Sequence, residues 1–400
     1  ICSDPVWPEG RRTVATTDPS EFVSFVRGRP DPLRMERAIE LARNGLGRVA
    51  PNPPVGALLV AGTDVAEGWH THHGGHHAEI NCLAAARSAG IDVTGADLYI
   101  SLEPCGHHGK TPPCVEAIIE ARIGRVIVSV DDPNPVTAGV SYRLLEDAGI
   151  EVVRDLLAEQ GRWLAAPYLC RTRYGRPLVT AKWAMTADGK IACESGDSRW
   201  ITSELTRART RQARSEIDAI LVGVQTVISD DPRLTSDPPD AADPLRVVID
   251  PNCRTPVEAE ILKTPAATLI FCHAQQLDSD AAHRLQDAGA QLIGLDSSGD
   301  RIALEPLLAQ LSQRGVQDLL VEGGAETHGG FLTAGLIDRV QILIAPKLVG
   351  GAAAPGPIGG TGIEPMNRAV PLIHHRWSQI DEDLLLEGAV TPEGLGEEAR

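Results

Sequence analysis

The segment Leu102–Cys114 reads LEPCGHHGKTPPC, and the triplet His77-Ala78-Glu79 precedes it in the chain. Imidazole and thiolate are ligands that zinc prefers in proteins, and three protein ligands leave a fourth position for water. His77, Cys105 and Cys114 therefore predict a catalytic zinc site. Glu79 lies two residues after the proposed histidine ligand, where it can take a proton from that water and deliver it to a substrate.

The order H-x-E followed by P-C-x-x-C is typical of zinc-dependent nucleobase deaminases. Here eight residues, rather than two, separate Cys105 from Cys114. Zinc lowers the pKa of a bound water, and helix N-terminal amides favour thiolates. The pattern predicts hydrolytic deamination of an amino-substituted ring.

Two other metal sites are compatible with the same stretch of sequence. His107 or His108 can supply a fourth ligand, which would make the zinc structural. The nearby histidines form either an adventitious metal site or an exposed loop, and we expect most of them not to be ligands; they are His70, His72, His73 and His76.

The bulk composition limits the class of substrate. The net charge is −17, without a block of lysine and arginine, so a polynucleotide is disfavoured and a small molecule is expected. The chain has neither an apolar run that could span a bilayer nor the pattern of a signal peptide, which predicts a soluble cytoplasmic protein. In that compartment the cysteines outside the zinc site are expected to be reduced structural thiols.

Alternating helical and strand-like segments predict two α/β domains in the 400 residues. In the first, helices are expected at 33–43, 78–89, 114–121 and 142–148, and strands at 55–60, 97–102, 125–130 and 150–153. In the second, strands are expected at 178–183, 219–224, 245–249, 267–272, 318–321 and 340–346. We interpret 163–177 as a linker or domain edge, 230–244 as a surface loop and 391–400 as a frayed tail.

Several long motifs together resemble the bifunctional riboflavin-biosynthesis deaminase/reductase family. They are PNPPVG at 51–56, the span 68–79, the eight-residue insertion within 102–114 and DDPNP at 131–135. The resemblance covers roughly residues 33–386. It implies a cytidine-deaminase-like α/β/α sandwich followed by a dihydrofolate-reductase-like α/β domain. The implied organisation is an N-terminal extension at 1–32, a zinc deaminase domain at 33–162, a reductase domain at 176–388 and a C-terminal tail at 389–400.

The second half matches the family in Met185–Lys190, Ser198–Ser203 and Val321–Gly324. The resemblance implies that this half uses NADPH, with cofactor contacts from Ala184, Trp200, Thr226, Asp230, Gly324, Ala325, Glu326, Thr327, His328, Gly329 and Gly330. Implied substrate contacts are Ser198, Arg214, Leu234 and Glu322, with Asn52 contacting the pyrimidine in the first half. A guanidinium matches phosphate oxygens, which suits Arg214. Lys182 and Asp188 are candidates to assist at the sugar.

Three positions depart from the family pattern. Asp237 stands where the family typically has an arginine that contacts phosphate, and Lys110 replaces another arginine. The usual G-x-G after DPNP reads Gly139-Val140-Ser141. The first two changes can weaken or reroute phosphate binding, whereas the zinc motif is intact.

The resemblance implies two consecutive reactions of riboflavin biosynthesis on a pyrimidine ribosyl phosphate: removal of the 2-amino group, then reduction of ribosyl to ribityl by NADPH. One alternative is a zinc deaminase whose reductase half is inactive or altered. Others are a nucleic-acid deaminase, which the charge disfavours, and a zinc-stabilised scaffold without activity. The oligomeric state is open, with a homo-oligomer as one possibility.

Overall fold

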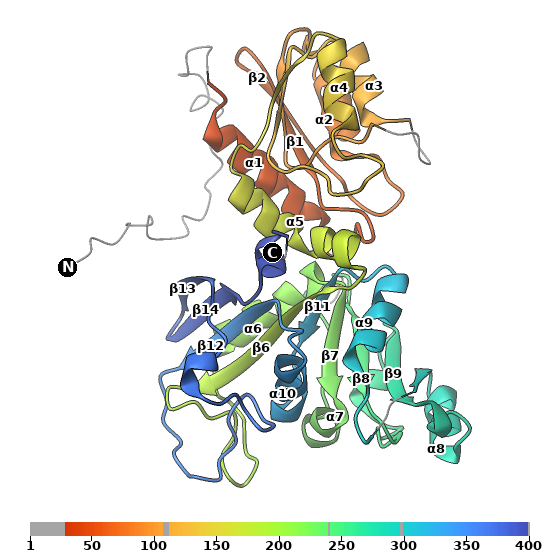
Figure 1. Cartoon of the computed structure of the whole chain (residues 1–400), viewed down its shortest axis with the longest axis vertical. Helices are drawn as coiled ribbons and strands as arrows, with labels where there is room; N and C mark the ends of the chain where they lie inside the picture. Colours follow the sequence, from red (N-terminus) through yellow and green to blue (C-terminus); the bar gives the residue numbers. More distant parts are fainter. Residues whose placement is uncertain (1–28, 107–111, 239–240, 297–298, 399–400) are drawn as a thin grey trace, which may run out of the picture.

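The computed structural model describes residues 29–106, 112–238, 241–296 and 299–398, which form two β-sheets joined by a long helix (Figure 1). The first sheet has five strands in the order β2-β1-β3-β4-β5. Its strands are β1 (Gly56–Ala61), β2 (Asp64–Trp69), β3 (Asp97–Ile100), β4 (Arg125–Val128) and β5 (Glu151–Val153). Its helices are α1 (Pro32–Ala42), α2 (Ala78–Ser88), α3 (Cys114–Glu120) and α4 (Val140–Asp147), with a 3-10 turn η2 (Arg43–Gly45).

Helices cover both faces of this sheet, as the expected α/β/α sandwich requires. In β1, Leu59 packs with α2, α3 and α4, whereas Leu58 packs with α1 on the opposite face. A strand buried on both faces is continuously apolar, which explains the sequence GALLV. The helix α1 begins one residue before the expected range of 33–43, because the Asp31 carboxylate accepts the Leu33 N–H at 2.9 Å and proline occupies the first turn.

The edge strand β2 was not expected from the sequence. Its residues DVAEGW include two acids and a glycine, which have low strand propensity. The glycine is explained by packing, because a Cβ atom at Gly68 would lie 2.3 Å from the Cys82 nitrogen of α2. The close approach of α2 therefore explains why β2 carries a glycine at this position.

The segment 163–177, interpreted as a linker or domain edge, is helical for most of its length. Helix α5 (Ala158–Tyr174) runs through it, with Pro167 inside, and ends at Gly175, whose φ of +68° is favourable for a glycine cap. Leu164 packs under the first sheet, and Cys170 packs against Leu178 at the start of the second. Contacts with both halves thus stabilise a helix that contains a proline and a glycine, both of which are unfavourable in a helix interior.

The second sheet has nine strands in the order β10-β9-β8-β7-β11-β6-β12-β14-β13. They are β6 (Leu178–Thr186), β7 (Ala219–Gly223), β8 (Leu245–Ile249), β9 (Thr268–His273), β10 (Gln291–Leu295), β11 (Asp318–Val321), β12 (Arg339–Ala345), β13 (His374–Ile380) and β14 (Asp383–Ala389). Its α-helices are α6 (Glu204–Ala213), α7 (Val224–Asp230), α8 (Asp280–Asp287), α9 (Leu304–Gln313) and α10 (Ala325–Thr333). Short 3-10 helices are η3 (Arg214–Glu216), η4 (Glu260–Leu262), η5 (Ala274–Gln276), η6 (Met366–Arg368) and η7 (Pro392–Leu395).

The six strands expected in this half are present, and most of the sheet is parallel, with α9 and α10 on one face and α7 and α8 on the other. Three strands were missed: β10, β13 and β14. The last two pair antiparallel at the sheet edge, and β13 is largely exposed, so its sequence HHRWSQI lacks an apolar run.

The frayed tail expected from Thr391 is also wrong for residues 391–398. Thr391 caps η7 by accepting the Gly394 N–H at 3.3 Å, and Arg339 donates to the Gly394 carbonyl at 2.6 Å. A Cβ atom at Gly394 would lie 2.2 Å from the Asp338 carbonyl oxygen, so this glycine permits the turn to pack on the start of β12. The N-terminal extension falls almost wholly outside the described residues.

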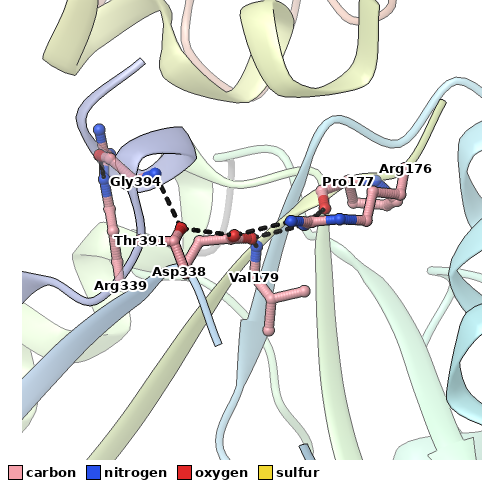
Figure 2. A network of polar contacts seen from close by, with 7 residues as sticks. All are labelled: Arg176, Pro177, Val179, Asp338, Arg339, Thr391 and Gly394. Carbon is pink, nitrogen blue, oxygen red and sulfur yellow. Dashed lines mark hydrogen bonds and ion pairs between the residues drawn. The ribbon is translucent and has the colours of Figure 1, made fainter. Parts of the chain in front are cut away.

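A buried carboxylate holds the start of the second sheet together (Figure 2). Asp338 is fully buried and accepts hydrogen bonds from Arg176 at 2.6 and 2.8 Å, from the Val179 amide at 2.8 Å and from the Thr391 hydroxyl at 3.0 Å. These donors come from the end of α5, from β6 and from the C-terminal segment. Removing one member of a buried ion pair lowers the stability of the fold, because the other member is left as a buried charge without a partner.

We expect Asp338→Ala to lower the free energy of unfolding by about 3–5 kcal/mol, because it leaves the Arg176 guanidinium buried without its counter-ion. Urea unfolding followed by circular dichroism measures the loss. Arg233→Ala, which removes a mostly exposed ion pair with Glu260, is the control and should cost far less. Equal effects of the two substitutions would contradict this account.

Candidate functional site

The three proposed zinc ligands meet at the N-terminal ends of two helices. His77 is the residue before α2, Cys114 is the first residue of α3, and Cys105 lies in the loop after β3. His77 Nδ1 lies 3.6 Å from Cys105 Sγ and 3.3 Å from Cys114 Sγ, and the three ligand atoms all lie within 4.8 Å of one another. Nitrogen and sulfur on a tetrahedral zinc ion are about 3.5 Å apart, so both the donor set and its geometry fit zinc.

The thiols are prepared for metal binding by their surroundings. The Cys114 amide, the first of α3, donates to Cys105 Sγ at 3.2 Å. The contact with the Cys114 thiol, and then that with His77, lowers the pKa of Cys105 to about 4, while the pKa of Cys114 is raised because it is the donor in this pair. A bound divalent ion would favour the thiolate of both.

Glu79 lies in the first turn of α2 and is 3% exposed. Burial raises its pKa to about 7, and the neighbouring Cys105 acts in the same direction. A carboxyl group that gains and loses a proton near neutral pH suits general acid–base work. The arrangement therefore provides three metal ligands with a proton carrier beside them.

Asn52 is linked to the zinc site through a histidine that the sequence reasoning did not single out as functional. His70, which is 2% exposed, donates from Nδ1 to the His76 carbonyl at 2.9 Å, so its Nε2 accepts the Asn52 side-chain amide at 3.0 Å. Its ring stands edge-on to the His77 ring, with centroids 5.4 Å apart. In the sequence His70 stands out only as one of several clustered histidines. The fold shows that it directly follows β2 and is buried.

Among the described residues, His77, Cys105 and Cys114 form the one group that could hold a metal. The fourth-ligand candidates His107 and His108, and the departure at Lys110, lie outside the described residues. Of the other histidines, His72 and His73 are exposed in the loop before α2, as the exposed-loop interpretation expects.

A second cluster of charges lies in the other half, between the middle of β6, the end of β11 and η3. Lys182 Nζ lies 3.6 Å from Glu322 Oε1, and Arg214 donates to Glu322 Oε2 at 2.9 Å and to the Thr235 carbonyl at 3.2 Å. Although burial opposes it, the charges of Arg214 and Lys182 lower the pKa of Glu322 to about 2. Burial lowers the pKa of Lys182. Two cations around one carboxylate leave a net positive charge that suits a phosphate or a polarised sugar oxygen.

Three of the four implied substrate residues of this half are brought together here. Arg214 and Glu322 are in direct contact, and Leu234, which is buried with a φ of +55°, precedes the Thr235 carbonyl that Arg214 binds. Arg214 Nε is buried with no hydrogen-bond partner within the described part of the chain. Ser198 lies apart, in an open cleft that Trp200 and Lys347 also line.

The implied cofactor turn lies against α7. A Cβ atom at Gly323 would be 2.6 Å from the Gly223 nitrogen, and one at Gly324, whose φ is +41°, would be 3.4 Å from Thr226 Oγ1. Only glycine at position 323 allows this approach, which brings Gly324 and Thr226 together. No side chain of the described residues caps α10, which leaves first-turn amides available to a phosphate group. These features fit a dinucleotide.

The other implied cofactor residues are placed unequally. Ala184 is partly buried in β6, Trp200 is 61% exposed under the Arg207 guanidinium, and Asp230 ends α7, where burial raises its pKa. In the turn itself, Ala325 and Thr327 belong to the first turn of α10, and Glu326 pairs with Arg301 at the surface. Gly329 and Gly330 follow within the same helix. His328 is 2% exposed and bonds the Val321 and Pro357 carbonyls, which is a structural role.

Two further positions have defined partners. Asp237 lies 3.6 Å from Arg211 of α6, with both side chains nearly half exposed. Asp188 accepts the Thr186 hydroxyl at 2.5 Å and the Val349 and Gly350 amides, which lowers its pKa to about 2. Asp188 thus holds a turn against residues 349–350.

In the first half, Gly139 directly precedes α4 with a φ of +68°, and Ser141 donates to Glu103 at 2.5 Å.

Two family models match the two halves of the chain. The model described as the cytidine and deoxycytidylate deaminase zinc-binding region matches residues 30–130, and that of the RibD C-terminal domain matches residues 177–386. The first contains the histidine and both cysteines of the metal cluster, and the second contains the buried charge cluster. None of the described helices is both long and apolar enough to cross a membrane.

Whole-chain relatives agree with this division. The riboflavin biosynthesis proteins RibD of Actinobacillus pleuropneumoniae and Bacillus amyloliquefaciens are each 42% identical, over 89% and 88% of this chain and 94% of their own lengths. The crystal structure of a diaminohydroxyphosphoribosylaminopyrimidine deaminase/5-amino-6-(5-phosphoribosylamino)uracil reductase from Thermotoga maritima is 34% identical, with a TM-score of 0.78 over 90% of this chain and 98% of that one. Acinetobacter baumannii RibD is 33% identical, with the same TM-score and coverage. One chain thus combines a zinc-dependent deaminase domain with an NADPH-dependent reductase domain, and it belongs to the RibD family of bifunctional riboflavin-biosynthesis enzymes.

Proposed function

We propose that the chain catalyses two consecutive steps on one pyrimidine ribosyl phosphate. In the first, residues 33–162 hydrolyse the 2-amino group of 2,5-diamino-6-(5-phosphoribosylamino)pyrimidin-4-one. In the second, residues 176–388 reduce the ribosyl group with NADPH to give 5-amino-6-(5-phosphoribitylamino)uracil. The observation that carries the proposal is the meeting of His77, Cys105 and Cys114 beside a buried Glu79. The name of the Thermotoga maritima relative supports the same pair of reactions.

In the deaminase half, His77, Cys105 and Cys114 would hold zinc. When bound, zinc supplies a Lewis acid that makes water nucleophilic near neutral pH. Glu79 would accept the first proton of the attacking water on its carboxylate and pass it to the ring nitrogen, and would then carry the remaining proton of the added hydroxyl to the leaving amine. Asn52 would orient the pyrimidine. Its amide nitrogen is engaged by His70, so its amide oxygen is the atom available to accept a ring N–H.

In the reductase half, Arg214, Leu234, Glu322 and Ser198 would contact the substrate. The cofactor would lie along Ala184, Trp200, Thr226, Asp230 and the turn 324–330, with phosphate at the first amides of α10. The hydride belongs to NADPH, and the chain supplies orientation and charge. Lys182 would stabilise negative charge on the sugar oxygen, held in place by Glu322.

An inactive reductase half is the alternative that Asp237 suggested. The contact of Asp237 with Arg211 offsets the like charge that this aspartate would present to a phosphate, and the Lys182–Glu322–Arg214 cluster is assembled. We therefore propose that both halves are active.

We also propose that the enzyme acts in the cytoplasm on a free small molecule rather than on nucleic acid. Free thiols at Cys82, Cys105, Cys114, Cys170, Cys193, Cys253 and Cys272 suit a reducing compartment, and the charge of −17 disfavours phosphate polymers. A homo-oligomer is supported by exposed apolar side chains on β13 and in the segment that precedes it, where Leu348 is 79%, Met366 85% and Trp377 55% exposed. Light scattering in solution tests this assembly.

Both activities are expected in one steady-state assay with the pyrimidine substrate and NADPH. Chelation of zinc should stop ammonia release, while NADPH oxidation on separately deaminated substrate continues, because the two sites use different groups. Added zinc should restore the first step. Accumulation of deaminated product without NADPH consumption would contradict the bifunctional proposal.

Glu79→Gln should bind one zinc ion and lose deamination by about 10²–10⁴-fold, because the amide cannot carry the proton. Zinc content by mass spectrometry and ammonia release measure the two effects. Glu116→Gln, an acid in the first turn of the neighbouring helix α3, is the matched control and should keep the wild-type rate. Wild-type deamination by Glu79→Gln would remove Glu79 from the mechanism.

Lys182→Met should reduce NADPH oxidation by at least about a hundredfold while leaving deamination unchanged, because the sugar oxygen loses its positive partner. Stopped-flow absorbance at saturating NADPH separates this loss from weaker cofactor binding. Lys263→Met, at an exposed lysine of the same half, serves as the control. A normal reductase rate in Lys182→Met would assign the lysine to structure alone.

A further inference from the structure

The segment between α1 and β1 lies between the zinc site and the second half of the chain. A Cβ atom at Gly45 would be 2.7 Å from the His70 carbonyl oxygen, and one at Gly47, whose φ is +68°, would be 2.1 Å from the Ser215 carbonyl oxygen of η3. A side chain at Gly47 would push the two halves apart, and one at Gly45 would push the segment away from His70. The segment that carries Asn52 is therefore in close contact with both.

Gln317, directly before β11, is the residue of the second half that reaches this segment. It is 3% exposed, and its side-chain amide donates to the Pro51 carbonyl. Its own backbone is fixed on both sides, since its N–H donates to Asp218 at 2.8 Å and its carbonyl accepts the Leu178 N–H at 2.7 Å. The donor thus projects from a rigid position in the nine-stranded sheet.

From Pro51 a continuous series of contacts leads to the metal ligands. Asn52 follows Pro51, and its side chain bonds His70 at 3.0 Å. His70 in turn holds the His76 carbonyl at 2.9 Å, and His76 is the residue before His77. A hydrogen bond from the reductase half therefore braces the turn that positions Asn52 beside the zinc site.

We propose that Gln317 is a positioning residue for the deaminase reaction: by holding the Pro51 carbonyl it orients Asn52 toward the pyrimidine. This inference rests on the substrate role proposed for Asn52. Small displacements of an orienting group weaken substrate binding strongly, because hydrogen-bond geometry is steep in distance and angle. The deaminase half then depends on the folded reductase half for substrate affinity.

The two halves also touch where Asn52 is not involved, which provides a matched control. Arg171 of α5 donates to the Ser312 carbonyl at 3.2 Å, at the same end of the second half. A substitution there disturbs domain packing while it keeps the Gln317 donor to the Pro51 carbonyl. Domain packing and the positioning of Asn52 can therefore be separated.

The test compares Gln317→Met, which keeps the length and removes the donor, with Arg171→Met in the full-length zinc enzyme. We expect Gln317→Met to raise the KM of deamination about fivefold to tenfold, as the loss of one hydrogen bond predicts, with kcat within about twofold. Zinc content and NADPH oxidation on deaminated substrate should be unchanged. Gln317→Lys, which restores an N–H donor, should return the KM to within about twofold of wild type. Arg171→Met should leave the KM unchanged.

A double-substitution cycle decides between positioning and packing. Asn52→Ala should raise the KM, and adding Gln317→Met to it should have no further effect. An unchanged KM in Gln317→Met, an equal change in Arg171→Met, or full additivity with Asn52→Ala would each overturn the proposal. An unchanged KM in Asn52→Ala would instead reject the substrate role of Asn52 and, with it, the basis of this inference.

Discussion

The first half of the chain depends on two helix N-termini that point at one place. His77 precedes α2, Cys114 opens α3, and the first amide of α3 also bonds the Cys105 sulfur. Helix N-termini favour negative charge, which suits two thiolates and a nearby carboxylate. The sheet and the helices on its two faces hold these ends at the distances that tetrahedral zinc requires. The same burial that supports the site keeps the Glu79 proton exchangeable near neutral pH.

The second half contains two groups of buried charges. Asp338 is compensated by four donors from three segments, so its role is to join structure. The cluster of Lys182, Arg214 and Glu322 has one positive charge in excess and a buried guanidinium nitrogen left over, so it is incomplete by itself. Compensated charges stabilise the fold, whereas an uncompensated buried group suits binding of an anionic or polarised substrate.

The junction between the halves is specific rather than a flexible tether. Helix α5 packs on both sheets, the C-terminal turn η7 packs against α5, and Gly47 lets the two halves approach closely. Arg339 lies 3.8 Å above the Trp163 ring and donates to its carbonyl, joining β12 to α5. Such an arrangement allows a residue of one half to orient a side chain of the other.

The sequence by itself determined the zinc chemistry, the two α/β domains and most strands, because ligand type, spacing and apolar runs are local properties. It did not reveal β2 and β13, whose polar edge sequences become strands only through pairing with neighbours, nor β14, which lies between β12 and β13. Helix α5 could not be predicted for a related reason. The stability that it gains from contacts with both halves exceeds the low helix propensity of its proline and glycine. His70 and Gln317 acquire their roles only in the folded chain, because the contacts that define them join residues 18 and 266 positions apart.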